Sequence, residues 1–457
     1  MKNKISTVAG ILLVTAPVAI YFYIVWKYAI NIPFWDEYAC GLAWIERFRQ
    51  ASFPDQFYLM FRQTHEHRVF SYYLTLLADY KLFGELNFRI IIITGNLVMT
   101  GLLFVLYKMK QFERNEILLF APVLLLLLIP RHEITDWGIV MISSSGQYLL
   151  AFSSMLLLTK MSPRSFFAAI ILAIIATFSF GNGMFVFICG FIILLQKDHF
   201  SIKKSVIWAV AMVISVLLYF TDYNFNAGRH PKAEMLHHPF MFIQYILVFV
   251  GNVLSPVMKG HIILVTLAGL LILVYLGYLL SFKWNTIKQQ YLALSCLGFI
   301  FLSVVASAVS RVGAGLQPAS SGRYSLIPAL FAAILYIITI NIYKRRNNWI
   351  IYGFIAFLVV LYGFGLKNNV DRLESHKYQL ADGLLSFYVD PTNAMLVGPR
   401  KAEARKLLST AIKAGYYDPP PISEIFPEVC LKEDLAVIPE TNDILLCFDT
   451  IINRTDF

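Results

Sequence analysis

The chain has 457 residues and a formal net charge of +10, and 58% of its residues are hydrophobic against only 14% charged. Soluble domains carry about 25% charged residues, so this composition excludes an ordinary soluble protein and predicts an integral membrane protein. The Lys and Arg residues lie between apolar segments rather than on one basic face. We therefore expect no nucleic-acid partner and attribute the positive charge to membrane topology.

Long apolar segments recur along most of the chain. A helix needs about 20 such residues to cross a hydrocarbon core about 30 Å thick, and no small-residue cleavage site follows the first segment. The expected spans are residues 8–30, 88–107, 117–130, 138–159, 165–180, 183–196, 205–221, 261–281, 290–309, 325–343 and 349–366. The sequence thus predicts an all-α integral membrane bundle of about 11 transmembrane helices.

Basic residues cluster between these segments and set the expected orientation. The clusters are Lys2 and Lys4; Lys108, Lys110 and Arg114; Lys160 and Arg164; Lys197, Lys203 and Lys204; Lys283 and Lys288; and Lys344, Arg345 and Arg346. Placing all of them in the cytoplasm puts the N-terminus inside and the C-terminus outside. This threading requires residues 240–256 to enter the membrane and return, or to lie at its surface, because a crossing there would invert every later cluster.

The chain divides into two predicted parts. Residues 1–366 form the multi-span domain, with a large first extracytoplasmic loop at residues 31–87. Residues 367–457 mix charge, proline and short apolar stretches, with a helical pattern near 400–414 and strand-like runs at 435–438 and 444–448. These patterns predict a small extracytoplasmic α+β C-terminal domain.

Two adjacent carboxylates follow the first span. Asp36 and Glu37 come directly after Trp35 at the expected membrane boundary. Interfacial aromatic residues and acidic residues at a helix start are ordinary features there. The functional interpretation is that Asp36 or Glu37 is a base whose pKa is tuned by partial burial and by its neighbour's charge.

A second polar cluster, His65-Glu66-His67-Arg68, lies further along the same loop. The two histidines are two positions apart and no matching ligands follow, so the spacing disfavours a protein-bound zinc ion. The cluster is either a helix cap with a solvated face, or a polar pocket shaped by Glu66, His67 and Arg68.

Arg311 and Arg323 lie on the expected external side, against the positive-inside trend, in a glycine-rich link that ends at Tyr324. Arginine forms forked hydrogen bonds to phosphate, and glycine lets backbone amides approach an anion. The link therefore predicts an anion site, although anionic lipid head groups or local carboxylates also explain the arginines. Arg229 and His230 are a weaker candidate of the same kind.

Other polar groups have simpler expected roles. The short link that follows Pro130 carries Arg131, His132, Glu133 and Asp136, which loop solvation explains one by one. Asn182, between two glycines, is expected to permit a tight turn.

Four short motifs together resemble a known superfamily. They are Trp35-Asp36-Glu37, His65-Glu66-His67-Arg68, Gly181-Asn182-Gly183 and Ser321-Gly322-Arg323-Tyr324. In their order along residues 1–366, they are similar to marks of the C-type (GT-C) superfamily of membrane glycosyltransferases. The resemblance implies a GT-C-like fold and a bacterial inner-membrane protein that transfers a sugar from a polyprenyl-phosphate-linked donor. The acceptor would be a glycan or lipid at the extracytoplasmic face.

The resemblance also implies roles for individual residues. Asp36 or Glu37 would take the proton of the acceptor hydroxyl, and Arg323, helped by Arg311, would neutralise the departing lipid phosphate. The substrate-binding residues would be Trp35, Glu66, His67, Arg68, Arg311, Arg323 and Tyr324. One carboxylate pair without a clear third ligand allows a divalent metal, Mg²⁺ or Mn²⁺, without requiring one. The early carboxylates and late arginines would have to share one external pocket.

Two other functions use similar residues: a transporter or flippase of a lipid-linked saccharide, and a polysaccharide polymerase or ligase. A transporter is expected to line its spans with polar groups. The predicted spans are almost free of ionisable groups, and their main polar residues are Asn96, Ser143, Ser144, Ser145 and Gln147. The sequence therefore favours the enzyme.

Overall fold

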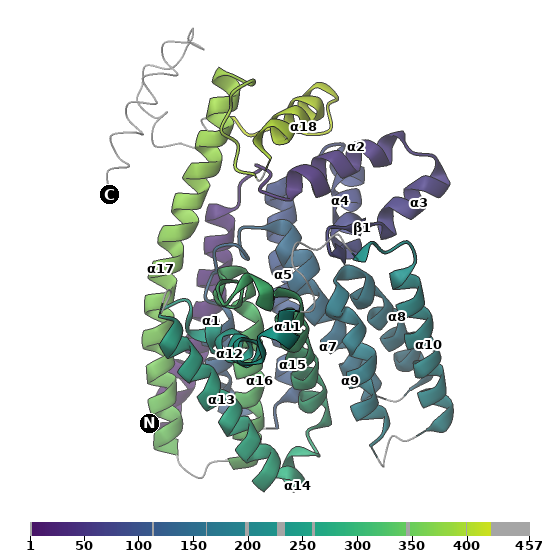
Figure 1. Cartoon of the computed structure of the whole chain (residues 1–457). Coiled ribbons are helices and arrows are strands. Elements are labelled where there is room, and N and C mark those ends of the chain that lie inside the picture. Colours follow the sequence, from purple (N-terminus) through teal and green to yellow (C-terminus); the bar gives the residue numbers. More distant parts are fainter. Residues whose placement is uncertain are drawn as a thin grey trace. The chain divides into compact units, whose positions relative to one another are not determined.

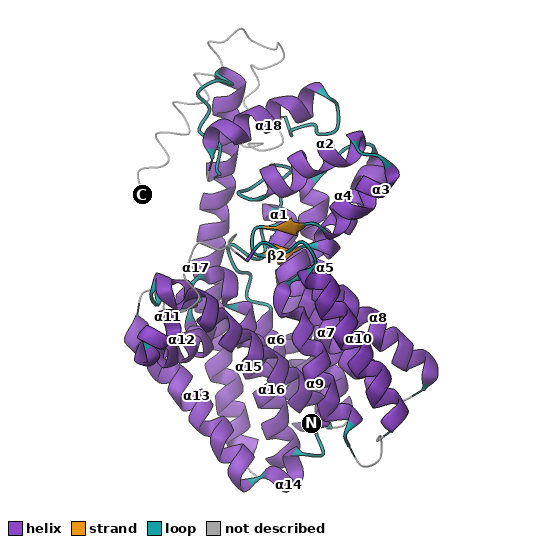
Figure 2. Cartoon of the chain, turned by 45° about the vertical axis from the view of Figure 1, so that its right-hand side comes forward, coloured by secondary structure: helices purple, strands orange, loops and turns teal. Residues whose placement is uncertain are grey.

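The computed structural model describes residues 2–111, 114–160, 162–196, 201–225, 234–257, 261–343, 348–398 and 400–421. Within these ranges the chain is almost entirely helical, and its one sheet is a two-stranded hairpin (Figures 1 and 2). The candidate pair Arg229 and His230 and the strand-like runs at 435–438 and 444–448 lie outside the described residues.

Each of the eleven predicted spans overlaps a helix. These are α1 (Lys2–Tyr28), α5 (Phe88–Met109), α6 (Ala121–Leu127), α7 (Gly146–Leu158), α8 (Pro163–Ser179), α9 (Phe185–Leu194), α10 (Ile202–Phe220), α13 (Ile262–Phe282), α15 (Tyr291–Arg311), α16 (Leu326–Tyr343) and α17 (Asn348–Val389). Eight helices of the described chain are long and apolar enough to cross a membrane. The prediction of an all-α, multi-pass membrane bundle is confirmed at this level, and the number of crossings stays a prediction.

Shorter elements connect these helices. The further α-helices are α2 (Ala43–Gln50), α3 (Phe53–Phe61), α4 (Phe70–Phe83), α11 (Glu234–His237), α12 (Pro239–Gly251), α14 (Trp284–Ile287) and α18 (Lys401–Lys413). The π-helical turns are η1 (Tyr38–Leu42) and η3 (Val140–Ser145). The 3-10 turns are η2 (Arg114–Phe120), η4 (Gly181–Met184), η6 (Asn252–Leu254), η7 (Val312–Ala314), η8 (Gln317–Ser320) and η9 (Gly322–Tyr324). The strands are β1 (Gln63–Thr64) and β2 (His67–Arg68).

The segment expected to enter the membrane without crossing forms α12 and then η6. Its 13 helical residues span about 20 Å at about 1.5 Å per residue, which is short of a core about 30 Å thick. Its orientation stays a prediction.

The chain separates into two compact units. Unit 1 comprises Met1–Lys27, Phe53–Thr75 and Ile92–Leu373, and unit 2 comprises Tyr28–Ser52, Leu76–Ile91 and Glu374–Phe457. The expected domain boundary at residue 366 falls inside α17, which continues unbroken because no proline interrupts it. The residues from Glu374 onward belong to the same compact unit as two segments that include parts of the first loop, Tyr28–Ser52 and Leu76–Ile91.

Unit 2 is held together by contacts between segments far apart in sequence. The Tyr417 hydroxyl donates to the Asn31 carbonyl at 2.7 Å, and the Leu86 amide donates to the Tyr416 carbonyl at 2.9 Å. Helix α18 confirms the helical pattern expected near residues 400–414, and its buried Leu408 faces the inside of this unit.

Unit 1 is a bundle with one large apolar core, in which α7 packs against α8 and α12 against α13. The α12–α13 contact is made by backbone. A Cβ atom on Gly269 would lie 1.8 Å from the Leu247 carbonyl oxygen, and one on Gly251 would lie 1.8 Å from the Val265 carbonyl oxygen. Such small residues let membrane helices approach closely where hydrophobic burial drives little association.

This contact predicts opposite effects for two glycines of α13. Gly269→Ala forces α12 and α13 apart and should lower stability by about 1–3 kcal/mol or more. Gly277, which has no atom within 4 Å of an added Cβ, is the matched control, because Gly277→Ala should be neutral or stabilising by about 0.5–1 kcal/mol through helix propensity. Thermal unfolding of the purified protein in detergent measures both, and equal midpoints for the two variants would contradict the packing argument.

Candidate functional site

Unit 1 contains a cavity of about 450 Å³ that gathers several of the predicted site residues. We call it the Arg311 cavity. Its polar lining includes Glu66, His67, Ser144, Gln147, Asn182, Ser303, Ser307 and Arg311. Its aromatic lining includes Tyr148, Phe180, Tyr219, Tyr223, Phe249 and Tyr324. A volume of this size and a lining of aromatic walls with a few polar groups are typical of small-molecule sites.

The β1–β2 hairpin presents Glu66 and His67 to the cavity. Thr64 pairs with His67, so His65 and Glu66 form a two-residue loop. His65 adopts a left-handed conformation with φ of 52°, which this loop geometry requires and which histidine tolerates better than most side chains. The motif His65-Glu66-His67-Arg68 is therefore part of a tight hairpin, and two of its residues, Glu66 and His67, line the cavity.

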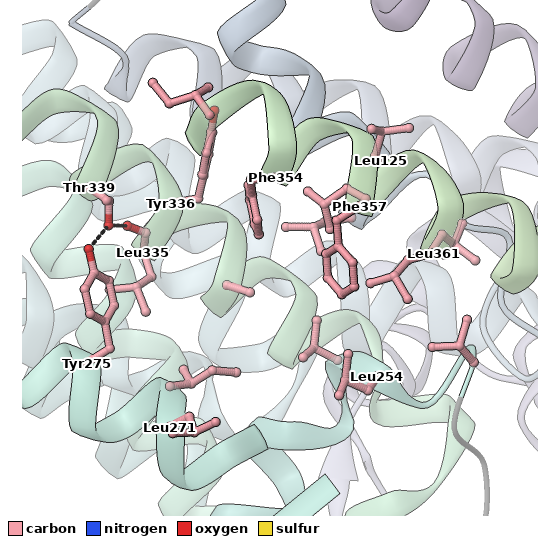
Figure 3. Close-up of a pocket in the computed structure, with 18 of the residues that line it drawn as sticks. Leu125, Leu254, Leu271, Tyr275, Leu335, Tyr336, Thr339, Phe354, Phe357 and Leu361 are labelled. Carbon is pink, nitrogen blue, oxygen red and sulfur yellow. Dashed lines mark hydrogen bonds between the residues drawn. The ribbon is translucent and has the colours of Figure 1, made fainter. Parts of the chain in front are cut away.

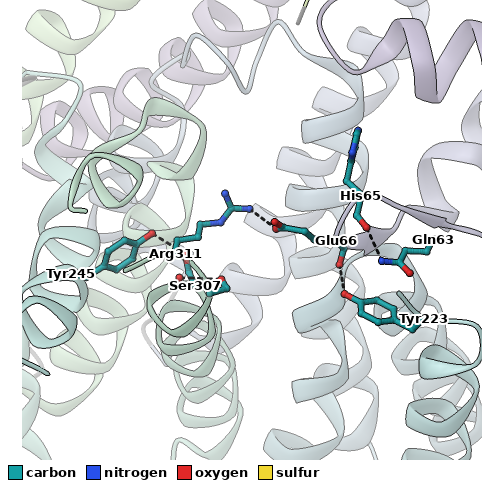
Figure 4. Close-up of polar contacts among 8 residues, drawn as sticks. Gln63, His65, Glu66, Tyr223, Tyr245, Ser307 and Arg311 are labelled. Carbon is teal, nitrogen blue, oxygen red and sulfur yellow. Dashed lines mark hydrogen bonds and ion pairs between the residues drawn. The ribbon is translucent and has the colours of Figure 1, made fainter. Parts of the chain in front are cut away.

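The hairpin is anchored to the end of α10. The Gln63 side-chain amide donates to the Asn224 carbonyl at 3.1 Å and accepts from the Asn224 amide at 2.7 Å. The Tyr223 hydroxyl donates to the Glu66 carbonyl at 2.8 Å (Figure 4). The buried Arg68 guanidinium donates to the carbonyls of Phe61, Tyr219 and Thr221. All three nitrogens of the Arg68 side chain therefore donate to carbonyls. Because His67 precedes Arg68 in β2, these hydrogen bonds also fix the position of His67.

Glu66 and Arg311 form an ion pair in the Arg311 cavity. Arg311 is the last residue of α15, and its Nη2 lies 3.2 Å from Glu66 Oε2 (Figure 4). The side chains are 23% and 32% exposed for Arg311 and Glu66, so the pair is open to an incoming anion. The structure thus joins two motifs that the sequence identified separately.

Both unusual arginines lie beside the ring of Tyr324. The Arg311 guanidinium carbon is 5.6 Å from the Tyr324 ring centroid, and that of Arg323 is 5.4 Å from the same centroid. Both distances permit cation–π attraction. The buried Arg323 Nε has no hydrogen-bond partner, and the Glu133 carboxylate lies near Gly322, 3.5 Å from where a Cβ would be. Two guanidinium groups around one ring favour anion binding.

His67 is a neutral group beside this charge. Its ring stacks on Phe180 with centroids 3.8 Å apart. Burial, followed by the Arg311 charge, lowers the pKa of His67 to about 3. The imidazole is therefore uncharged near neutral pH, and its buried Nδ1 has no hydrogen-bond partner.

A chain of hydrogen bonds lines the inner part of the Arg311 cavity. Gln147 Nε2 donates to Asn182 Oδ1 at 2.7 Å, and Asn182 Nδ2 donates to Ser303 Oγ at 2.6 Å. Asn182 reaches this position because α8 and α9 are broken at η4, where Gly183 lies against the Ala176 carbonyl. From the sequence, Asn182 was expected to permit a turn and Gln147 was only a polar exception within a span. The features that could have indicated their role are the uncharged amide of Gln147 inside an apolar helix and the Gly181-Asn182-Gly183 break between two apolar helices.

Trp35, Asp36 and Glu37 lie in unit 2, before the π-helical turn η1. Trp35 is 41% exposed and left-handed with φ of 51°. Glu37 is 1% exposed and accepts a hydrogen bond from the Phe34 amide at 3.0 Å, whereas Asp36 is half-buried. Burial and the Glu37 charge raise the pKa of the following Tyr38. Of the two carboxylates, Asp36 is the more accessible. The shared pocket predicted for these carboxylates and the late arginines joins residues of both units and stays a prediction.

The short link that follows Pro130 contains a buried arginine and a contact between a histidine and a carboxylate. Arg131 is buried and donates to the carbonyls of Leu126 and Leu127 at the end of α6, which is a helix C-cap role. The His132 Nδ1 lies 2.8 Å from Asp136 Oδ2. Glu133 is left-handed with φ of 66°, so a strained non-glycine residue occurs in this link as in the two earlier motifs.

A second cavity in unit 1, of about 480 Å³, has a different character (Figure 3). It is lined by apolar side chains such as Leu125, Leu271 and Phe357, together with Tyr275, whose hydroxyl is 3.0 Å from the Thr339 hydroxyl. Its described lining includes no carboxylate, imidazole or guanidinium group. This cavity is therefore not a site for acid–base chemistry.

The Arg311 cavity offers little to a divalent cation. Glu66 is the one carboxylate among its described lining residues, and it is paired with Arg311. Divalent cations such as Mg²⁺ prefer several oxygen ligands and net negative charge. The cavity fits an anion better than a cation.

No family model matches the chain, and neither a curated protein nor a solved structure matches it. The fold nevertheless defines a class. Eight helices in the described part of the chain are long and apolar enough to cross a membrane, which indicates a multi-pass, all-α membrane protein. Its unit 1 holds a cavity with several polar lining residues.

The lowered pKa of His67 makes a stability prediction. The folded-state pKa is about 3 against an ordinary value of 6.5, so below pH 6.5 the unfolded chain binds a proton that the folded chain does not. This contribution to stability is fully present above pH 6.5 and falls as the pH drops toward 3, by up to about 1.4 kcal/mol per pH unit. Unfolding midpoints between pH 7 and 4 should therefore fall less steeply in His67→Asn than in the wild type. His65→Asn, at an exposed position of the same hairpin, is the control and should keep the wild-type slope. Identical slopes for all three proteins would contradict the lowered pKa of His67.

Proposed function

We propose that this protein is a membrane glycosyltransferase. It transfers a sugar from a polyprenyl-phosphate-linked donor to a glycan or lipid acceptor, at the extracytoplasmic face of a bacterial inner membrane. The observation that carries the proposal is the Arg311 cavity, where an accessible guanidinium and a carboxylate lie 3.2 Å apart among aromatic and uncharged polar side chains. Neutral polar groups suit sugar hydroxyls, and the guanidinium suits a phosphate.

The position of the cavity supports an external site. Within unit 1, the β1–β2 hairpin that carries Glu66 lies at the end opposite α14 (Figures 1 and 2). Lys283 and Lys288 flank α14 and belong to the basic clusters expected in the cytoplasm. With that orientation the hairpin faces the extracytoplasmic side.

The charges suggest how the transfer proceeds. The acceptor oxygen attacks the anomeric carbon while a carboxylate takes its proton. The bond from that carbon to the phosphate oxygen breaks, and the phosphate leaves on its lipid. Arg311, with Arg323 beside the same Tyr324 ring, neutralises the charge that develops on the phosphate. Because the phosphate competes for Arg311, its arrival releases the Glu66 carboxylate.

Two carboxylates are candidates for the base. Glu66 lies in the Arg311 cavity, and Asp36 is the accessible member of the pair that the GT-C resemblance implies. Glu37 is the weaker candidate because it is buried and accepts a hydrogen bond from the Phe34 amide. A divalent metal is not needed for this mechanism, since the guanidinium groups supply the positive charge.

The apolar cavity of unit 1 suits the lipid part of such a donor. It is formed by α6, α13, α16 and α17 and is lined almost entirely by hydrocarbon side chains (Figure 3). A hydrocarbon chain gains nothing by leaving the bilayer, so this cavity would hold the chain in place rather than drive binding.

A transporter or flippase of a lipid-linked saccharide is the second candidate. The observation that favours it is the amide chain of Gln147 and Asn182, because polar groups inside apolar helices often mark a translocation path. A polysaccharide polymerase or ligase would use the same donor chemistry on longer glycans.

Single-sugar transfer by the purified protein, with polyprenyl-phosphate sugars as donors, tests the base. Removing the base should lower kcat by about 10²–10⁴-fold. We expect this loss in Glu66→Gln or in Asp36→Asn, and little change in Glu37→Gln. Glu403→Gln, at an exposed ion pair of α18, is the matched control. Wild-type rates in all four variants would remove both base assignments, and no transfer from any donor together with lipid-linked saccharide flipping in vesicles would favour the transporter.

Arg311 should matter through charge geometry as well as charge. Arg311→Lys keeps the positive charge but loses the planar guanidinium group, which can donate two parallel hydrogen bonds to a phosphate. It should lower kcat by about 10²–10³-fold, as the loss of one stabilising donor does. Arg400→Lys, an exposed arginine ion-paired to Glu403, should leave the rate unchanged. Full activity in Arg311→Lys would contradict a bidentate contact with the phosphate.

A further inference from the structure

The Arg311 cavity has a charged outer part and an uncharged inner part. Arg311 and Glu66 are 23% and 32% exposed. Gln147 and Tyr148 are each 1% exposed, and Ser303 is 5% exposed. A ligand that enters therefore meets the ion pair first and the neutral groups last.

The inner groups are not fully satisfied by the protein. Gln147 uses its amide nitrogen on Asn182, but its buried Oε1 has no hydrogen-bond partner. The buried His67 Nδ1 also has none. The buried hydroxyls of Tyr148 and Tyr219, which also line the cavity, have none either. Unpaired buried polar atoms are rare because each is costly, and four around one cavity point to hydrogen-bonding groups supplied by a ligand.

Gly181, which also lines the cavity, lets the Tyr219 hydroxyl and the His67 ring approach the backbone closely. A Cβ at this position would lie 2.9 Å from the Tyr219 hydroxyl and 3.3 Å from His67 Nδ1. The rings of Phe180 and Tyr148 also line the cavity and offer flat apolar surfaces. A compact ring that carries several hydroxyl groups matches this combination of flat walls and scattered hydrogen-bonding atoms.

The inner part also excludes charge. Its polar groups include two amides, the hydroxyls of Ser303 and Tyr148, and an imidazole that is neutral near pH 7 because its pKa is lowered to about 3. A carboxylate or ammonium group of a ligand would be buried there without a counter-charge, which is strongly unfavourable.

We infer that Gln147, Asn182, Ser303 and His67 form a subsite that selects an uncharged saccharide ring over a uronic acid or amino sugar. The inference rests on the proposed function for the identity of the ligand as a phosphate-linked sugar. It adds that the phosphate lies at Arg311 and the neutral ring lies at the inner amides.

Binding of soluble sugar phosphates tests this without requiring transfer. The full chain in lipid nanodiscs is titrated calorimetrically with inorganic phosphate and with the 1-phosphates of glucose, galactose, mannose, glucuronic acid and glucosamine. The best neutral sugar phosphate should bind at least about 10-fold more tightly than inorganic phosphate, which leaves the inner polar atoms unpaired. It should exceed either charged sugar phosphate by at least about the same factor, because a charged ring would bury its charge without a counter-charge.

Substitutions locate the subsite. Gln147→Leu and Ser303→Ala should weaken the best neutral sugar phosphate by about 10-fold or more and leave inorganic phosphate unchanged. Gln290→Leu is the matched control, because Gln290 is also a buried glutamine that pairs with an asparagine, Asn341, at 2.8 Å but lies outside the described lining of the Arg311 cavity. Unfolding midpoints of all variants show that each is folded.

The outcomes separate the inference from the proposed function. Equal affinity for neutral and charged sugar phosphates, affinity for inorganic phosphate equal to that for every sugar phosphate, or equal losses in Gln147→Leu and Gln290→Leu would each overturn the subsite. Failure of every ligand to bind would overturn both proposals. The expected binding pattern without any sugar transfer would leave the subsite standing and overturn the glycosyltransferase.

Discussion

The ion pair between Glu66 and Arg311 is the interaction on which the organisation of the cavity depends. It joins residues 245 positions apart, one from a hairpin in the first loop and one from the end of α15. Each charge would be costly alone at a partly buried site, and each is accessible enough to exchange its partner for a ligand. The surrounding structure serves to place the two groups. Arg68 holds the hairpin on the end of α10 through the carbonyls of Tyr219 and Thr221, and Tyr324 packs beside the Arg311 guanidinium.

The sequence predicted the helices well because hydrocarbon imposes a strong constraint. A membrane span must satisfy every backbone group internally, so an apolar segment of sufficient length has few alternatives to a helix. All eleven predicted segments overlap helices, and eight of these helices in the described chain are long and apolar enough to cross a membrane. The same rule says nothing about where the chain leaves the apolar region. Helix α17 therefore continues through Asp371 and Glu374 to Val389, past the residue where its apolar stretch ends, and the predicted domain boundary falls inside a helix.

Sequence patterns pointed to the charged residues of the Arg311 cavity and to His67, but not to Gln147 or Ser303 as binding groups. Charge is conspicuous in an apolar chain, so Glu66 was noticed in a dense polar motif and Arg311 by its position against the positive-inside trend, although their contact depends on folding. Gln147, Asn182 and Ser303 are ordinary residues one at a time, and Asn182 next to glycine has an obvious role in a turn. Their significance is in a contact between three elements, α7, η4 and α15, which no local pattern encodes. Arg68 shows the reverse case, since its charge suggested substrate binding while its nitrogens contact backbone carbonyls.

The division of the Arg311 cavity into a charged entrance and a neutral interior also limits which reactions it suits. A transporter must let its cargo pass through and release it, so a fixed guanidinium next to an amide chain would hold a phosphate-linked sugar more firmly than transport requires. An enzyme gains from the same arrangement if the phosphate becomes more negative as its bond to the sugar breaks, because Arg311 then stabilises the transition state more than the bound donor. In the proposed reaction the neutral amides would contribute equally before and during the transfer, so their role would be recognition. Charge would then serve catalysis and uncharged polarity would serve selection, and this separation of roles is the physical reason for proposing a transferase rather than a carrier for this cavity.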